Sequence, residues 1–314
     1  MVVSIIIVNW NTGNLLTNCL KSVSEAVQDL DFEVIVVDNA STDGSAAIVR
    51  EYFPWVDLIE SQINLGFAAG NNLALCRASG ESFLLLNPDT IVLPEAISHL
   101  VTAMRANPRL GVAGAQLLNL DGSRQTSWGV FPSLWTEVPL LSRLGKRRRL
   151  QSAVEQSSKS LALTLVDWVS GAGLMIRRQA VEEVGLLDEA YWLYTEETDW
   201  CYRVCEAGWQ IALSPAAQIY HLARAASRQR FVTTMLHFYQ SRVRFMRKHH
   251  GDTQADLVRR LYWLRALLWQ CRPEGSPLAR AYLDLSSTEI CAAYRQLQQA
   301  MSQPLDSLLA SSWL

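Results

Sequence analysis

Residues 82–90 read Ser82-Phe83-Leu84-Leu85-Leu86-Asn87-Pro88-Asp89-Thr90, an apolar run followed at once by a polar turn. Such a run is typical of a short buried strand. Pro88 has no N–H to donate to a sheet and pushes Asn87 into an extended or turn conformation, so the strand ends here. Asp89 then lies at the carboxyl end of a strand, where open α/β sheets bind their ligands. Its carboxylate either holds a divalent cation against a diphosphate, or caps the helix expected near Pro94 or fills the turn.

Strands and helices alternate on both sides of this stretch. The β-branched, apolar run at 3–8 and further mainly apolar runs at 32–37, 56–60, 82–86 and 111–118 predict strands. Helical spacing and helix-start signals predict helices from about 15, 46, 64 and 94. This alternation with short connections predicts an α/β fold with a doubly wound, mostly parallel, Rossmann-like sheet.

The pattern changes after residue 118. Residues 123–165 show no clear periodicity, so we expect an irregular, mobile connection in which the basic run 146–149 is solvated. Further on, we expect a loop and then a strand within 166–178, short strands at 209–213 and 218–221, and a helix with Thr195 as its N-cap. From about residue 230 the pattern is helical, and the Pro- and Gly-containing stretch 272–277 divides it in two.

Composition excludes several classes of protein. The 314 residues are 49% apolar and 18% charged, which is an ordinary globular balance. The net charge of −2 gives no reason to expect nucleic acid as a partner. The six cysteines lack metal-binding spacing, and we expect them to be reduced thiols in a cytoplasmic protein. The chain also lacks a G-x-G-x-x-G after the first strand and lacks a P-loop.

Polar groups at the expected strand ends and helix starts are candidates for a site. Asp38 and Asn39 end the second strand, where they either bind a base or ribose or satisfy their own turn. Gly66 opens a helix, where the backbone can approach a ligand closely. Glu196 and Glu197 open another helix, whose dipole favours ionised carboxylates. Aromatic rings for stacking on sugars are offered by Trp168, Trp192 and Trp200, although most tryptophans pack in cores.

Five groups of residues together resemble family 2 glycosyltransferases, most closely the rhamnosyltransferase-like branch. They are Val8-Asn9-Trp10-Asn11, Val37-Asp38-Asn39-Ala40-Ser41-Thr42-Asp43-Gly44, Asn64-x-Gly66-Phe67-Ala68-x-Gly70-Asn71-Asn72, Leu86-Asn87-Pro88-Asp89 and Glu196-Glu197-x-Asp199-Trp200-Cys201-x-Arg203. The match covers about residues 2–228 in the right order, and the combination is specific. It implies a GT-A catalytic domain over residues 1–228, followed by a helical region over residues 229–314.

The resemblance implies a role for each matching residue. It assigns donor binding to Asn9, Asn11, Asp38, Asn39, Asn64, Gly66, Asn71, Asn87, Asp89 and Gly171. Asp89 is the remaining acid of the family's DxD metal motif, whose first position here is Asn87. His221 resembles the downstream histidine that completes a Mg²⁺ or Mn²⁺ site, although alone it reads as a packed strand-end histidine. Glu197 stands where the family places its catalytic base, in place of the more common Asp.

The reaction implied by the resemblance is an inverting transfer of a sugar, rhamnose or a similar hexose, in cell-surface polysaccharide synthesis. The donor is a nucleotide sugar, and the acceptor is a hydroxyl of a glycan or of a lipid-linked saccharide. The metal stabilises the leaving nucleoside diphosphate, and Glu197 takes the proton from the acceptor hydroxyl. Residues 258–269 are apolar, aromatic and basic, so they form either a packed helix or an interfacial one. Peripheral contact with the inner face of the membrane is the second expectation.

Two other functions share parts of this pattern. A sugar-1-phosphate nucleotidyltransferase has the same sheet and metal, but its Gly-rich activating loop with an Arg is absent from the first turn of this chain. A non-catalytic glycan-binding relative keeps the fold and loses the acids, whereas Asp38, Asp89 and Glu197 are all present here.

Overall fold

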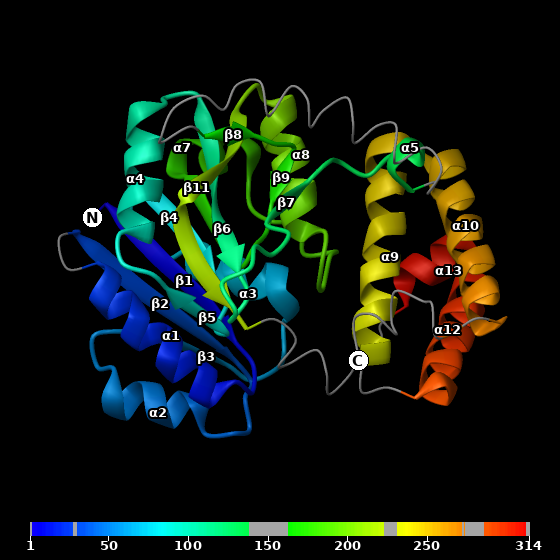
Figure 1. Cartoon of the computed structure of the whole chain (residues 1–314), viewed down its shortest axis with the longest axis horizontal. Helices are drawn as coiled ribbons and strands as arrows, with labels where there is room; N and C mark the ends of the chain where they lie inside the picture. Colours follow the sequence, from blue (N-terminus) through cyan, green and yellow to red (C-terminus); the bar gives the residue numbers. More distant parts are fainter. Residues whose placement is uncertain are drawn as a thin grey trace. The chain divides into compact units, whose positions relative to one another are not determined.

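The computed structural model describes residues 2–27, 30–137, 163–222, 231–271, 273 and 286–311. The chain divides into two compact units (Figure 1). Unit 1 is drawn from Met1–Phe131, Lys146–Trp192 and Glu196–Ala226, and unit 2 from Pro132–Gly145, Leu193–Thr195 and Ser227–Leu314. The predicted domain boundary at 228/229 lies outside the described residues and stays a prediction, as does the solvated basic run 146–149.

Unit 1 is built around a nine-stranded sheet in the order β3-β2-β1-β4-β10-β6-β11-β5, with β8 also paired to β11. The strands are β1 (Val3–Asn9), β2 (Phe32–Asn39), β3 (Asp57–Ser61), β4 (Ser82–Leu86), β5 (Thr90–Val92), β6 (Leu110–Leu118), β8 (Thr164–Leu165), β10 (Gly173–Arg177) and β11 (Gln210–His221). The pairs β1–β2, β2–β3, β1–β4 and β6–β11 are parallel. In contrast, β10 is antiparallel to β4 and β6, and β5 and β8 are antiparallel to β11.

Helices cover both faces of this sheet. They are α1 (Gly13–Ala26), α2 (Ser45–Tyr52), α3 (Gly66–Leu75), α4 (Ala96–Ala106), α7 (Arg178–Val184) and α8 (Glu196–Glu206). Alternate residues of the buried strands face opposite sides. Ile5 and Ile7 of β1 therefore pack in one cluster with α1, α2 and α4, whereas Ile6 and Val8 pack in another with α3, α7 and α8. The predicted doubly wound, mostly parallel α/β sheet is confirmed.

Two strand predictions were wrong in detail. Residues 90–92, for which no strand was predicted, form the short strand β5. The two strands expected at 209–213 and 218–221 are one strand, β11, which keeps pairing with β6 across a register shift between Ser214 and Gln218. Three residues are too few to show a periodic pattern, and Pro215 within β11 reads locally as a strand break.

The connection after residue 118 is more ordered than expected. Residues 119–123 form a tight turn, Leu118 bridges to Arg124, and β7 (Trp128–Gly129) pairs with β9 (Trp168–Val169). The rest of the expected connection, 138–162, lies outside the described residues. Thr195 precedes α8 as predicted, but with φ 71°, which is not the extended backbone usual for an N-cap.

Unit 2 is helical in its described part. Its helices are α5 (Leu134–Glu137), α9 (Phe231–His250), α10 (Asp252–Cys271), α12 (Ser287–Met301) and α13 (Leu305–Ala310). Gly251, with φ 84°, ends α9 and lets α10 begin at once. Tyr262 of α10 donates to Glu137 Oε2 at 2.6 Å inside this unit. Most of the predicted break at 272–277 lies outside the described residues.

Helix α10 contains the apolar and basic stretch singled out in the sequence. One face packs against α9 and α12 through Ala255, Val258, Tyr262 and Ala266, so the predicted packed helix is present. Other apolar residues of the same helix, among them Leu257, Leu264 and Leu268, are exposed. None of the helices in the described part of the chain combines the length and apolarity needed to cross a membrane.

Candidate active site

Asp89 and His221 meet at the end of the sheet because of the way β5 pairs. Residues 87–89 form the turn between β4 and β5, and Thr90 Oγ1 donates to Asn87 O at 2.7 Å. Strand β5 runs antiparallel to the end of β11 and places Thr90 opposite His221. Asp89 Oδ1 consequently lies 3.3 Å from His221 Nε2, and the two side chains are only 14% and 15% exposed. Asn87 Nδ2 lies 3.4 Å from the same ring nitrogen.

Asn9 and Asp38 lie opposite each other at the ends of β1 and β2. Asn9 Nδ2 donates to Asp38 Oδ1 at 3.0 Å, and Ser41 N donates to Asp38 Oδ2 at 3.0 Å. Asn11 Oδ1 accepts from Thr42 N at 2.7 Å. Asp38 Oδ2 thus closes the turn that follows β2, as one of the two alternatives predicted, whereas Oδ1 bonds a side chain at the end of β1. The nucleoside-binding role of these residues stays a prediction.

Asn39 connects the end of β2 to the start of α3. Its Nδ2 donates to Asn64 Oδ1 at 3.0 Å and to Gly66 O at 3.0 Å. Asn64 Oδ1 also accepts from Gly66 N at 2.9 Å. Asn71 is buried and donates to Phe67 O at 2.8 Å. These predicted donor residues are therefore neighbours in space and shape the start of α3, and their contact with a donor stays a prediction.

Gly66 is required by a close contact within the protein. Its φ is 80°, and a Cβ added to it would lie 2.5 Å from Trp192 O. Phe67 N donates to the same carbonyl at 2.8 Å. A residue with a side chain would both strain the backbone and collide with Trp192. This contact accounts for the glycine without a ligand.

Two adjacent carboxyl groups begin α8, in Glu196 and Glu197. Burial and the charge of Glu197 raise the pKa of Glu196 well above its ordinary value. The neutral form of Glu196 is therefore favoured by its surroundings, whereas the helix dipole alone favours the ionised form.

The segment 171–172 lies beside both Glu197 and Asn87. A Cβ added to Gly171 would lie 3.9 Å from Glu197 Cβ, and Ala172 O accepts from Asn87 N at 3.4 Å. The predicted base and the turn that carries Asp89 thus adjoin the same two residues.

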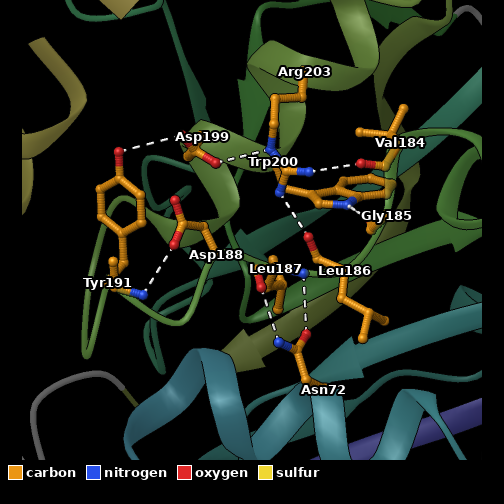
Figure 2. A network of polar contacts seen from close by, with 11 residues as sticks. Asn72, Val184, Gly185, Leu186, Leu187, Asp188, Tyr191, Asp199, Trp200 and Arg203 are labelled. Carbon is orange, nitrogen blue, oxygen red and sulfur yellow. Dashed lines mark hydrogen bonds and ion pairs between the residues drawn. The ribbon is translucent and has the colours of Figure 1, made fainter. Parts of the chain in front are cut away.

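A polar network holds the start of α8 in place (Figure 2). Asp199 is fully buried and accepts from Tyr191 Oη at 3.2 Å and from Arg203 Nε at 3.0 Å. The Arg203 guanidinium also donates to Val184 O at 2.9 Å and to Leu186 O at 2.7 Å. One arginine thereby joins the helix to the loop that precedes it.

Helix α3 also holds this loop, through hydrogen bonds between Asn72 and Leu187 (Figure 2). Asn72 Nδ2 donates to Leu187 O at 2.9 Å, and Leu187 N donates to Asn72 Oδ1 at 3.0 Å. Trp200 Nε1 donates to Gly185 O at 2.8 Å, and its ring is 1% exposed. The suggestion that Trp200 stacks on a sugar is therefore wrong, because the ring is part of the core.

Residues 4–184, more than half of the chain, match glycosyl transferase family 2. The chain belongs to glycosyltransferase family 2. This glycosyltransferase is 28% identical over 301 residues to N-acetylglucosaminyl-diphospho-decaprenol L-rhamnosyltransferase of Mycobacterium tuberculosis, a match that covers 91% of this chain and 94% of the relative.

Two solved structures share the GT-A fold of this glycosyltransferase. Mannosyltransferase PcManGT from Pyrobaculum calidifontis, in complex with GDP-Man and Mn²⁺, has a TM-score of 0.57 at 19% identity and covers 98% of this chain and 84% of its own. GalNAc-T7 with UDP, GalNAc and Mn²⁺ has a TM-score of 0.58 at 14% identity and covers 94% of this chain and 55% of its own.

Two residues next to the Asp89 turn of the glycosyltransferase were missed in the sequence. Gln125 Oε1 lies 3.0 Å from His221 Nδ1. Cys19 Sγ lies 3.4 Å from Thr90 Oγ1, and burial raises the pKa of this thiol to about 12. Neither residue belongs to a motif with a chemical meaning of its own. The packing of α1 against β5 brings Cys19 near the site, and the hydrogen bonds between Gln125 and His221 bring Gln125 there.

The residues at this turn fit a divalent cation that is bound mainly by other ligands. Among the described residues, no group of three or more His, Cys, Asp and Glu side chains comes together. Asp89 offers a carboxylate oxygen and His221 an imidazole nitrogen, and Asp89 Oδ1 and His221 Nε2 lie 3.3 Å apart. Such a pair suits a cation whose remaining positions are filled by water and phosphate oxygens.

We expect Asp199→Asn to destabilise the glycosyltransferase, because it leaves the Arg203 guanidinium without its buried counter-charge. The free energy of unfolding should fall by about 2–4 kcal/mol in chemical denaturation. The matched control is Glu60→Gln, which breaks the exposed ion pair with Arg50 and should cost less than about 1 kcal/mol. Equal effects of the two substitutions would contradict the importance of the network.

Proposed function

We propose that this glycosyltransferase transfers L-rhamnose or a similar hexose from a nucleoside-diphosphate sugar to a hydroxyl of a lipid-linked saccharide, with inversion at the sugar's C1. The observation that supports it best is the meeting of Asp89, Asn87 and His221 at the end of β4, next to the segment that adjoins Glu197. The sugar and the acceptor are suggested by the Mycobacterium tuberculosis relative, whose name specifies both.

Asp89 and His221 would hold the metal of a metal-dependent reaction. A bound Mg²⁺ or Mn²⁺ supplies positive charge that stabilises the departing nucleoside diphosphate. Asn87 Nδ2, 3.4 Å from the His221 ring, is the amide donor nearest to this place and can bond a phosphate or ribose oxygen. A leaving group stabilised in this way needs no general acid, unlike that of a glycosidase.

In this proposal Glu197 is the general base. It takes the proton from the acceptor hydroxyl while that oxygen attacks C1 from the face opposite to the diphosphate. The raised pKa of Glu196 favours its neutral form, which reduces the negative charge beside the base. A Cβ at Gly171 would contact the Phe67 ring at 3.4 Å, so the glycine keeps this backbone close to Phe67 and Glu197.

A transfer assay with a panel of nucleotide sugars tests the function. We expect one of dTDP-rhamnose, UDP-hexoses and GDP-mannose to give a glycoside with a diphosphate-lipid-linked N-acetylglucosamine acceptor, and NMR to show the inverted anomeric configuration. Formation of a nucleotide sugar from a sugar 1-phosphate and a nucleoside triphosphate would instead identify a nucleotidyltransferase. Binding of glycan without turnover of any donor would identify a non-catalytic relative.

Glu197→Gln should lower kcat by roughly 10²–10⁴-fold, because the amide cannot accept the proton. The affinity for the nucleoside diphosphate should stay unchanged in calorimetry, since the substitution leaves the Asp89 turn intact. Glu206→Gln, at an exposed position of the same helix, is the control and should keep full activity. Normal turnover by Glu197→Gln would remove this residue from the role of base.

We also propose that the exposed face of α10 contacts the membrane that contains the acceptor. Leu257, Leu264 and Leu268 are 51%, 46% and 58% exposed, and Trp263 and Arg260 lie among them. Apolar residues with an interfacial Trp and a long basic side chain are typical of helices that lie in the membrane interface. The match to the decaprenol-linked relative omits only a tenth of the chain, so it extends into the helices beyond residue 231. Cytoplasmic location at the inner face stays a prediction.

We expect the protein to co-sediment with anionic phospholipid vesicles. The double substitution Leu264→Glu/Leu268→Glu should weaken this binding by about tenfold or more, because charges would replace two leucines that the bound helix buries in the membrane interface. Ile63→Glu, at a 65% exposed site in unit 1, is the control and should bind normally. Failure of the unmodified protein to bind vesicles would contradict the proposal, and a stable dimer dispersed by the double substitution would assign this face to a second copy instead.

A further inference from the structure

We propose that Gln125 is a positioning residue that fixes the tautomer of His221, so that its Nε2 presents a lone pair to the cation held with Asp89. This inference rests on the metal-dependent function proposed above. It concerns Gln125, which follows the turn 119–123 after β6 and lies in the segment for which the sequence predicted no regular structure. The evidence for it is a chain of hydrogen bonds in which the donor and the acceptor can be assigned from each of the two ends.

The first end of this chain is the carboxylate of Asp121. Ser123 Oγ lies 2.6 Å from Asp121 Oδ1, and an ionised carboxylate can only accept, so the hydroxyl donates. Ser123 Oγ is then the acceptor for Asn119 Nδ2 at 2.8 Å. Consequently the other amide atom, Asn119 Oδ1, faces Gln125 Nε2 at 2.8 Å.

The second end is a backbone carbonyl, His221 O. Gln125 Nε2 lies 2.6 Å from it and must donate, since a carbonyl oxygen has no proton to give. Both N–H groups of the Gln125 amide are therefore used, one on Asn119 Oδ1 and one on His221 O. The remaining atom, Oε1, can only accept, and it lies 3.0 Å from His221 Nδ1. The hydrogen of the neutral ring is thus on Nδ1.

The opposite ring nitrogen then points at the proposed cation site. With hydrogen on Nδ1, the neutral ring has its lone pair on Nε2, which lies 3.3 Å from Asp89 Oδ1 and 3.4 Å from Asn87 Nδ2. A lone pair and a carboxylate oxygen repel each other at this distance unless a proton or a cation lies between them. A hydrogen bond on the far nitrogen is the usual way in which proteins orient a metal-binding histidine.

Gln125 is itself held firmly by its backbone. Its N–H donates to Leu117 O at 2.8 Å, and its carbonyl accepts from Gln116 Nε2 at 3.2 Å. The adjacent bridge between Leu118 and Arg124 continues this pairing. The amide is therefore presented to His221 by a backbone that is tied to the end of β6.

The test separates positioning of the ring from support of the turn. Gln125→Glu keeps an acceptor for Nδ1 but loses both donated hydrogen bonds, whereas Gln125→Leu loses all three. Mn²⁺ affinity is measured by electron paramagnetic resonance, with whichever of UDP, dTDP and GDP the unmodified chain binds. We expect Gln125→Leu to weaken Mn²⁺ binding by about 10–100-fold and Gln125→Glu to keep it within a few fold.

The tautomer provides a second readout, which does not depend on the affinity for Mn²⁺. In ¹⁵N-histidine-labelled protein, the His221 resonances, assigned with His221→Ala, should show hydrogen on Nδ1 in the neutral ring, and Gln125→Leu should shift the ring toward hydrogen on Nε2. Hydrogen on Nε2 in the unmodified protein, or equal Mn²⁺ affinity in Gln125→Leu, would overturn the inference, as would equal losses in the Leu and Glu variants. Unchanged Mn²⁺ binding in both Asp89→Ala and His221→Ala would instead show that the proposed metal site itself is wrong.

Discussion

The antiparallel pairing of β5 with the end of β11 is the constraint on which the candidate site depends. Asp89 follows β4 and His221 ends β11, more than a hundred residues later in the chain. Only the three residues of β5, laid against β11, bring the carboxylate and the imidazole within 3.3 Å. The remainder of the sheet places this pair at the end of β4, and the turn after β6 adds Gln125 behind the histidine.

The site also depends on how burial and hydrogen-bond partners affect the neighbouring carboxyl groups at the start of α8. Two glutamates follow each other at the start of α8, and burial and the charge of Glu197 raise the pKa of Glu196, which favours its neutral form. Asp199, one turn further along, is matched by Arg203 and Tyr191. Three acidic residues within four positions therefore have different roles, and these roles follow from what each side chain touches.

Much of this architecture could be predicted from sequence because it follows from local patterns. The apolar run before Asn87-Pro88-Asp89 predicted a buried strand with a polar end, and the structure has both. Strand β5 was missed because three residues carry too little pattern, and β11 was divided in two because Pro215 reads as a break. Gln125 was missed for a different reason, since its partners come from β11 and from the turn before it.

Sequence also could not separate structural from functional uses of the same residue. Gly66 was expected to make room for a ligand, whereas the structure shows Trp192 in contact with it. Asp38 was a candidate for binding a nucleoside, and its two oxygens are used by Asn9 and Ser41. These roles do not exclude each other, because a side chain that orders a loop also sets the shape that the loop offers to a substrate.

The thiol of Cys19 has a practical consequence for studies of this protein. It lies beneath the turn at Asn87, and burial raises its pKa to about 12, so almost none of the reactive thiolate form exists near neutrality. Cys76, Cys205 and Cys271 are exposed. Maleimide reagents will therefore attach fluorophores or spin probes at the periphery and spare the sulfur beneath the site, so distances across the enzyme can be followed during turnover without removing any native cysteine.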